Sequence, residues 1–184
     1  MIEGKLKPQI LVAMPSLQDG YFDKSVILLC EYSESGAMGF VINSPSTTTV
    51  DDLLHELNLC AEVPQNRMIL IGGPVQPELC WVVHTADYQG QSTTPLGDQF
   101  ALTAAQEVLS SVTEGIVPED YMLGVGYTGW APGQLCGEIE QDNWWLADID
   151  PTSILKQPPE YRWEMVMDLL GLRAPFHSGT YLKA

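Results

Sequence analysis

Three glycine-bearing segments place small residues beside polar side chains, and these segments are where the sequence could form a ligand site. They span residues 36–45, 72–75 and 126–135, and Glu138 and Trp144 follow the third. Glycine lets a backbone or a ligand approach more closely than any other residue. We expect the segments to converge on one groove, with the binding residues Asn43, Gly72, Gly73, Pro74, Gly129, Trp130, Gly133, Gln134 and Glu138.

The third segment carries the most specific chemistry. Trp130 could form the floor of a pocket, and Gln134 could donate and accept hydrogen bonds in it. Glu138 lies one helical turn after Gln134 and could face the same pocket. The alternative interpretation is purely structural: Trp130 packs in the core, and the glycines relieve crowding.

Catalysis is a second hypothesis, with Glu138 or His84 as a general acid or base. His84 ends a predicted strand, where a lone histidine is more often a hydrogen-bonded structural residue. We expect His55 on a solvated helix face and His177 in the tail. No H-E-x-x-H motif or other set of three metal ligands is present, so we expect neither a metal nor a cofactor and assign no catalytic residue.

The sequence also lacks the motifs that mark common nucleotide and hydrolase sites. There is no G-x-x-x-x-G-K-[ST] loop and no G-x-S-x-G elbow. The letters from Gly124 to Gly129 match G-x-G-x-x-G, but the first glycine falls inside a predicted strand rather than after it. Dinucleotide binding is therefore weakly supported.

The charge of the chain excludes some partners. Eight Lys and Arg residues stand against 24 Asp and Glu residues, which gives a formal net charge of −16, and the cations do not cluster. Nucleic-acid binding draws on cations that neutralise phosphates, and anionic membranes attract the same cations. We expect no direct nucleic-acid or membrane binding. With no apolar run of transmembrane length and no signal-peptide pattern, we expect a cytoplasmic protein.

Four cysteines are spaced too widely for a C-x-x-C motif, so we expect free thiols in a reducing compartment. Cys30 and Cys80 fall in apolar strand patterns and are predicted to be small core residues. Cys136 lies in a polar, glycine-rich stretch, and whether it is reactive stays open.

Hydrophobic periodicity predicts alternating strands and helices without a strict strand–helix–strand repeat. Thr49 is expected to cap the first helix, and Thr103 to open the second with a capping box. The pattern favours an α+β fold with a mixed, largely antiparallel sheet. Strands are predicted at 10–14, 26–31, 38–42, 68–71, 79–84, 100–102, 121–127 and 144–149, and helices at 50–59, from 103, at 133–142 and at 161–170. We expect one domain over 1–184, with an irregular tail at 173–184.

The order and spacing of these motifs resemble the AlgH/YqgE family of bacterial proteins over roughly residues 1–172. The resemblance implies a bifurcated, barrel-like sheet flanked by helices, and a function that is not established. Some members carry the label of transcriptional regulator. The matching positions are Gly4, Pro15, Phe22, Ser25-Val26, 36–43, 72–75, 123–124, 126–130, 133–135, Glu138-Ile139 and Trp145.

The chain departs from the family pattern at two informative positions. Tyr32 stands where many relatives have histidine, and Cys136 where an acidic residue is common. A missing histidine weakens any case for acid–base catalysis. The leading hypothesis is therefore a non-enzymatic binding or regulatory protein that acts through a small-molecule or protein partner, and an enzyme of unknown class is the alternative.

Overall fold

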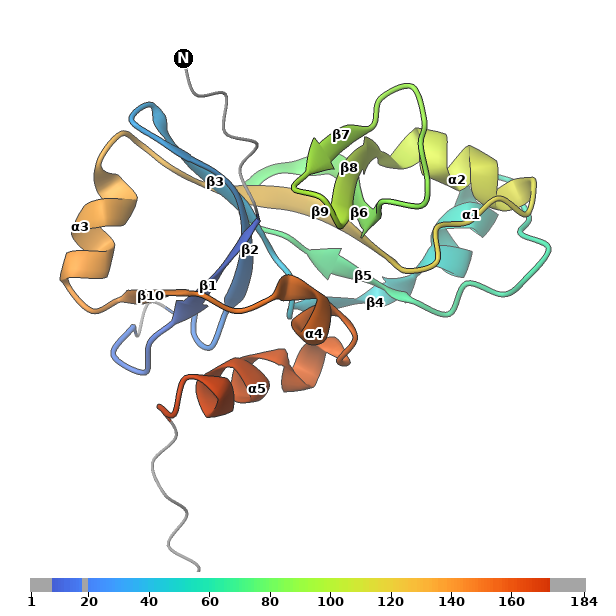
Figure 1. Ribbon diagram of the computed structural model, residues 1–184. Helices are drawn as coiled ribbons and strands as arrows, with labels where there is room; N and C mark the ends of the chain where they lie inside the picture. The colour runs from blue at the N-terminus through green and yellow to red at the C-terminus, as the bar shows by residue number, and fades with distance from the viewer. Residues whose placement is uncertain (1–7, 18–19, 173–184) are drawn as a thin grey trace, which may run out of the picture.

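The computed structural model describes residues 8–17 and 20–172 and confirms the α+β fold. A curled, largely antiparallel sheet forks into two arms, and helices cover its outer faces (Figure 1). The main path of the sheet runs, in spatial order, through β10 (Trp144–Ala147), β1 (Gln9–Ala13), β2 (Val26–Ser33), β3 (Gly36–Val41), β9 (Tyr121–Trp130), β6 (Val75–Thr85), β8 (Phe100–Ala104) and β7 (Thr94–Leu96).

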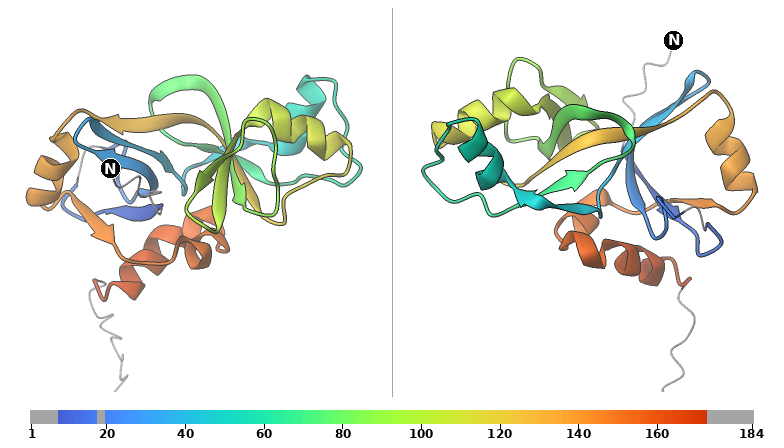
Figure 2. Two further views of the ribbon diagram at one scale, coloured as in Figure 1. Left: turned by 45° about the horizontal axis from the view of Figure 1, so that its top comes forward. Right: turned by 180° about the vertical axis from the view of Figure 1, so that it is seen from behind.

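The fork is at β9, the strand that both arms share (Figure 2). Its last residues pair with β3, through Ala37 and Trp130 among others, and its earlier residues pair antiparallel with β6. On that earlier part β5 (Met68–Ile71) pairs with it in parallel, and β4 (Pro45–Thr49) pairs with β5. We call the strands on the β3 side of β9 the β1–β3 arm and those on its β6 side the β6 arm. Residues near the end of β9 therefore lie between the two arms.

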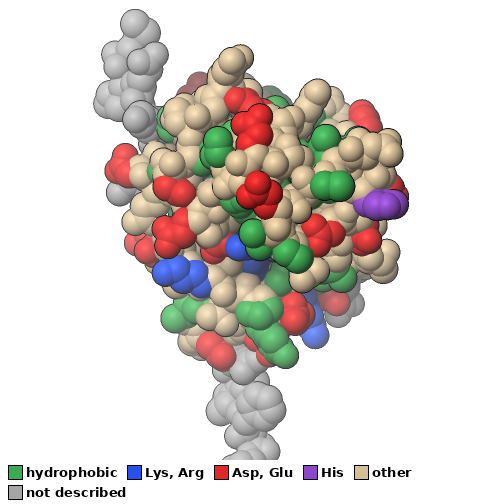
Figure 3. Space-filling view, turned by 90° about the vertical axis from the view of Figure 1, so that its right-hand side faces the viewer, with side chains coloured by type: hydrophobic (Ala, Val, Ile, Leu, Met, Phe, Trp, Pro, Cys, Tyr) green, Lys and Arg blue, Asp and Glu red, His purple; other side chains and the backbone are tan. Residues whose placement is uncertain are grey.

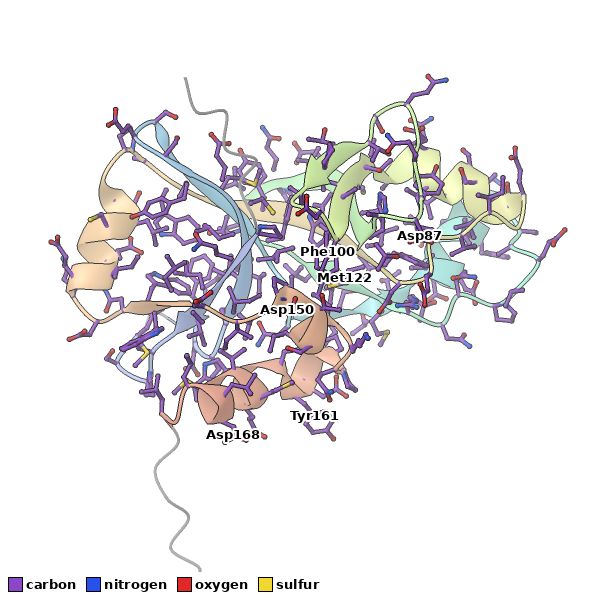
Figure 4. The ribbon with its side chains drawn as sticks, in the orientation of Figure 1. Asp87, Phe100, Met122, Asp150, Tyr161 and Asp168 are labelled. Atoms are coloured by element: carbon purple, nitrogen blue, oxygen red, sulfur yellow. The ribbon has the colours of Figure 1, made fainter. Side chains whose placement is uncertain are left out.

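The helices pack on different parts of this sheet. Helices α1 (Val50–Glu56) and α2 (Ala105–Thr113) share one hydrophobic cluster with strands of the β6 arm, while α3 (Gln134–Glu140) contributes Leu135 to a cluster inside the β1–β3 arm. A third cluster spans both arms and receives α4 (Pro151–Leu155) and α5 (Arg162–Leu169), with the short 3-10 turn Pro159–Tyr161 between these two helices. In Figure 4, Phe100 and Met122 lie in the interior, whereas Tyr161 and Asp168 lie on α5's outer side.

Glycines allow the chain to cross β9 after β5. A Cβ on Gly73 would lie 2.2 Å from the carbonyl carbon of Tyr127, and one on Gly124 would lie 2.2 Å from the Trp81 ring. The Gly72 N–H donates to the Val125 carbonyl at 2.8 Å, and the Val41 N–H donates to the Gly72 carbonyl at 2.8 Å. The segment 72–75 is thus no hairpin turn: it carries the chain from one side of β9 to the other.

Most predicted elements are present, and the first helix begins as predicted. Thr49 caps α1, and Asp52 completes a capping box with it. The predicted capping box at Thr103 is wrong, because Thr103 is a buried residue of β8 and α2 begins after Ala104 with no side-chain cap. Strands β4 and β7 and helix α4 were not predicted from the sequence.

Strand β6 also differs from its prediction. It begins at Val75 rather than at residue 79, and its register against β9 shifts between Val75 and Cys80. The bulge leaves Cys80 exposed, so the prediction that Cys80 is a core residue is wrong, whereas Cys30 is buried as predicted. In the described part of the chain, no helix has the length and apolar character needed to span a bilayer. The predicted tail at 173–184 lies outside the described residues.

Candidate functional site

Five of the nine predicted site residues line one hollow of about 420 Å³ between the end of β9, α3 and β10. Four of them come from the second and third glycine-bearing segments, which the fold brings together, and Glu138 follows the third. The five are Pro74, Gly129, Trp130, Gln134 and Glu138. Phe22, Thr128, Trp144 and Asn143 are among the other lining residues. The structure therefore joins two of the three predicted segments at this hollow.

The Glu138 carboxylate is held by three side-chain donors. The indole N–H groups of Trp130 and Trp144 both donate to Oε2, at 2.9 and 2.8 Å, and the Gln134 amide donates to Oε1 at 2.9 Å. A carboxylate has about four lone-pair positions, so one acceptor position is left. The arrangement fixes a negative group in a single orientation at the wall of the hollow.

The backbone around α3 explains why this group is placed so well. Gly133 adopts a left-handed conformation (φ 75°) as the N-cap residue, and the Ala131 N–H donates to Gln134 Oε1 at 3.0 Å. The same amide thus accepts from the turn and donates to Glu138. Leu135 is buried and anchors the helix to the β1–β3 arm. The site is a continuation of the core packing rather than a mobile loop.

Aromatic rings form the surroundings of the carboxylate. The rings of Trp130 and Trp144 meet edge to face, with centroids 5.9 Å apart, and Phe22 meets Trp144 at 5.7 Å. Both indoles are buried, with 7% and 3% of their surface exposed. Trp130 therefore packs in the core and also lines the hollow.

The remaining predicted residues do not line this hollow. Gly72 and Gly73 serve the crossing over β9, and Gly133 caps α3. Asn43 lies apart, because its Oδ1 accepts from the Val26 N–H at 2.7 Å and its amide donates to the Lys24 carbonyl at 2.8 Å. Asn43 thus fastens the start of β2.

His84, the second candidate for acid–base chemistry, is in a closed site. Its ring is 1% exposed, with Nδ1 2.7 Å from the Thr85 carbonyl and Nε2 2.7 Å from Thr103 Oγ1. Because the carbonyl can only accept, Nδ1 carries a proton. Thr103 Oγ1 lies 2.7 Å from Thr93 Oγ1, which accepts from the Gly90 N–H at 2.8 Å. The chain of hydrogen bonds is complete and buried around the imidazole.

Neither the second donor to Glu138 nor the contribution of Phe22 was predicted from the sequence. In the sequence, Trp144 only follows the third segment and begins the predicted strand 144–149. A tryptophan six residues after a carboxylate carries no local signal, because a helix end and a turn intervene before β10 returns it to the site. Among the described residues no group of three His, Cys, Asp or Glu side chains could hold a metal ion.

Comparison with known proteins identifies relatives along almost the whole chain. The profile of the AlgH-like family matches residues 10–175. A UPF0301 protein of Chromobacterium violaceum is 38% identical over 168 residues, which cover 90% of each chain. The solution structure of AlgH from Pseudomonas aeruginosa has a TM-score of 0.76 at 36% identity, covering 94% of this chain and 93% of that one. A Corynebacterium diphtheriae protein gives 0.70 at 29%, covering 89% and 86%.

Proposed function

This chain belongs to the AlgH-like family, and we propose that it is a non-enzymatic binding protein. It holds a small molecule, or the side chain of a protein partner, in the hollow beside Glu138. One observation carries this proposal: three donors orient the Glu138 carboxylate at the wall of a hollow of about 420 Å³. Small-molecule sites are typically concave and partly apolar, with a few polar groups placed to fix orientation.

The same geometry supports recognition over catalysis. A general acid or base must exchange a proton with its substrate, and a nucleophile needs an adjacent base. The three groups that bond Glu138 are two indoles and an amide, and none of these is a base or a nucleophile. His84 is buried and engaged at both nitrogens, so a substrate cannot reach it without local opening. The alternative enzyme therefore rests on Glu138 alone.

A regulatory role would run through a ligand or a protein partner rather than through DNA. The face that carries α1 and α2 shows acidic side chains spread over it and few basic ones (Figure 3). With a net charge of −16, the chain has little capacity to neutralise phosphates. We propose that the protein acts in the cytoplasm and senses a ligand there, and a titration against duplex DNA at low salt is expected to show no binding.

Native mass spectrometry of the protein as purified from cells tests the binding proposal. The wild-type chain is expected to carry a co-purifying molecule or partner. Gln141→Phe places a ring at the edge of the hollow without touching the three donors, and it is expected to reduce the bound fraction at least tenfold. Glu138→Gln removes the charge and is expected to do the same.

The matched control is Glu140→Gln, which changes an exposed carboxylate on the same helix. It is expected to keep the bound species. Equal loading of all four proteins would refute the assignment of this hollow. A bound molecule that the wild type converts and the Glu138→Gln variant only retains would establish the enzyme alternative instead.

A further inference from the structure

A second and larger hollow lies on the other face of the sheet at the end of β9. This groove encloses about 820 Å³ between the two arms, and β3, β6, β8 and β9 all contribute to it. Tyr127 lines the groove, whereas its neighbour Thr128 lines the hollow beside Glu138. Successive side chains of a strand point to opposite faces, so the two sites are separate even though Val75, Gly129 and Trp130 border both.

The floor of the groove is aromatic and apolar. The rings of Phe40 and Trp81 lie 4.2 Å apart between centroids, at an interplanar angle of 31°. Met38, Leu102 and Tyr127 pack beside them. A groove of this size with such a lining is within the range of sites that bury small apolar ligands.

The bulge in β6 builds one wall of the groove. The segment from Val75 to Cys80 spans five positions where β9 spans two, so additional residues project from the strand. Among them Gln76 has a positive φ of 46°, and Leu79 is 43% exposed while it lines the groove. A non-glycine residue in this conformation is uncommon and is found more often at binding sites than elsewhere.

The charge around the groove is one-sided. Of the described residues that line it, Glu31 is the only acidic or basic one, and no Lys or Arg is among them. Partial desolvation raises the pKa of the Cys80 thiol, although the residue as a whole is exposed. An anionic ligand would find no cationic side chain among the described lining residues, whereas a cation would meet Glu31 and the field of a chain with a net charge of −16.

From the apolar floor and the single acidic rim residue, we propose that this groove binds an amphipathic organic cation, with an aromatic or aliphatic body and one ammonium group. The body lies over Phe40 and Trp81, and the ammonium group lies at the rim beside Glu31. This site is independent of the hollow beside Glu138. A single ligand class is thereby assigned to a groove that residues of all three glycine-bearing segments line, among them Ala37, Val75 and Gly129.

Three probes of matched shape test the proposal: 4-phenylbutylamine, 4-phenylbutanol and 4-phenylbutyrate. Trp81 and Trp130 line the groove, so tryptophan fluorescence reports occupancy, and calorimetry gives the affinity. The amine is expected to bind about tenfold more tightly than the carboxylate, with the alcohol between them, because one exposed charge pair contributes modestly. The preference for the amine should shrink as salt is raised.

Two charge variants separate the head group from the body. Glu31→Gln is expected to bring the amine to the affinity of the alcohol, and Leu79→Lys to favour the carboxylate. The control Glu34→Gln changes an exposed carboxylate of the same hairpin that does not line the groove, and it should leave all three affinities unchanged.

Gly129 offers a variant that fills the groove. A Cβ at this position would meet only Tyr127 Cε2 at 3.5 Å and the Ala37 carbonyl oxygen at 3.8 Å, which are ordinary contacts. Gly129→Ile is therefore expected to fold and to weaken the amine at least tenfold, while Glu138→Gln has no effect on it. Equal affinities for the amine and the carboxylate, or no binding of any probe at millimolar concentration, would overturn the proposal. Leu79→Lys gives an independent result should Gly129→Ile fail to fold.

Discussion

Glu138 and His84 are the two residues whose chemistry made them candidates for acid–base work, and the fold treats them in opposite ways. Both have several hydrogen-bond partners within the protein. Glu138 is half-buried at the wall of a hollow, whereas His84 is 1% exposed within the β6 arm. The difference shows that residue type and hydrogen bonding do not by themselves identify a binding site. The side chain must also be accessible to a ligand.

The largest effect is expected from His84→Ala. The change leaves a cavity beside Tyr88 and removes the partner of Thr103, so unfolding should become easier by about 3 kcal/mol. Urea denaturation measures this change. The control His55→Ala alters an exposed histidine of α1 and should stay within about 0.5 kcal/mol. A small loss of stability in His84→Ala, together with altered ligand binding, would show that His84 is a site residue rather than a structural one.

A smaller effect is expected from Trp144→Phe, which keeps an aromatic ring but removes one indole donor to Glu138. A hydrogen bond to a charged group contributes about 1.5–3 kcal/mol, and the partial exposure of Glu138 favours the lower end. A double-mutant cycle with Glu138→Gln isolates the pairwise contribution. If the two changes are additive, the indole does not hold the carboxylate.

Acid destabilisation is expected from carboxylates on the outer surface that accept several hydrogen bonds. Hydrogen bonds from the Ser92 hydroxyl and from the backbone N–H groups of Ser92 and Gln91 lower the pKa of Glu107, which thereby holds the loop that carries Thr93. Because its pKa is lower in the folded state, this stabilisation is complete above the ordinary value of 4.5 and is lost as pH falls through the folded-state pKa.

Glu107→Gln is therefore expected to lower the urea midpoint at pH 7 and to flatten its dependence on pH below about 4.5. Hydrogen bonds from Thr49 and Thr152 lower the pKa values of Asp52 and Asp150 in the same way. The Glu107→Gln variant should therefore keep part of the acid sensitivity. An unchanged pH profile would show that the loop is held by other contacts.

The smallest effect on stability is expected at Cys136. The thiols of Cys136 and Cys30 differ in accessibility as Glu138 and His84 do. Cys136→Ser should change the free energy of unfolding by less than about 0.5 kcal/mol, because the side chain is exposed. A thiol reagent should label Cys136 in the folded protein but spare Cys30, where burial raises the pKa to about 12. Rapid labelling of Cys30 would indicate local opening of β2.

Local features of this fold were predictable from the sequence because they depend on neighbours along the chain. The start of α1 follows from Thr49 and Asp52, three residues apart, and the buried face of α2 follows from its spacing of apolar residues. The same dependence on neighbours explains why the predicted capping box at Thr103 is wrong. The local sequence fits a capping box, but the Thr103 hydroxyl bonds instead to His84, which lies 19 residues away in the sequence on the adjacent strand.

The candidate site was predictable in part. The sequence by itself determined the acidic charge, the main strands and helices, and the pairing of Gln134 with Glu138 across one helical turn. Only the tertiary structure decided that Trp144 completes the carboxylate's contacts, that Gly73 serves a chain crossing, and that Asn43 fastens β2. These outcomes depend on which strands pair at β9, and strand pairing joins residues whose separation along the chain carries no periodic signal.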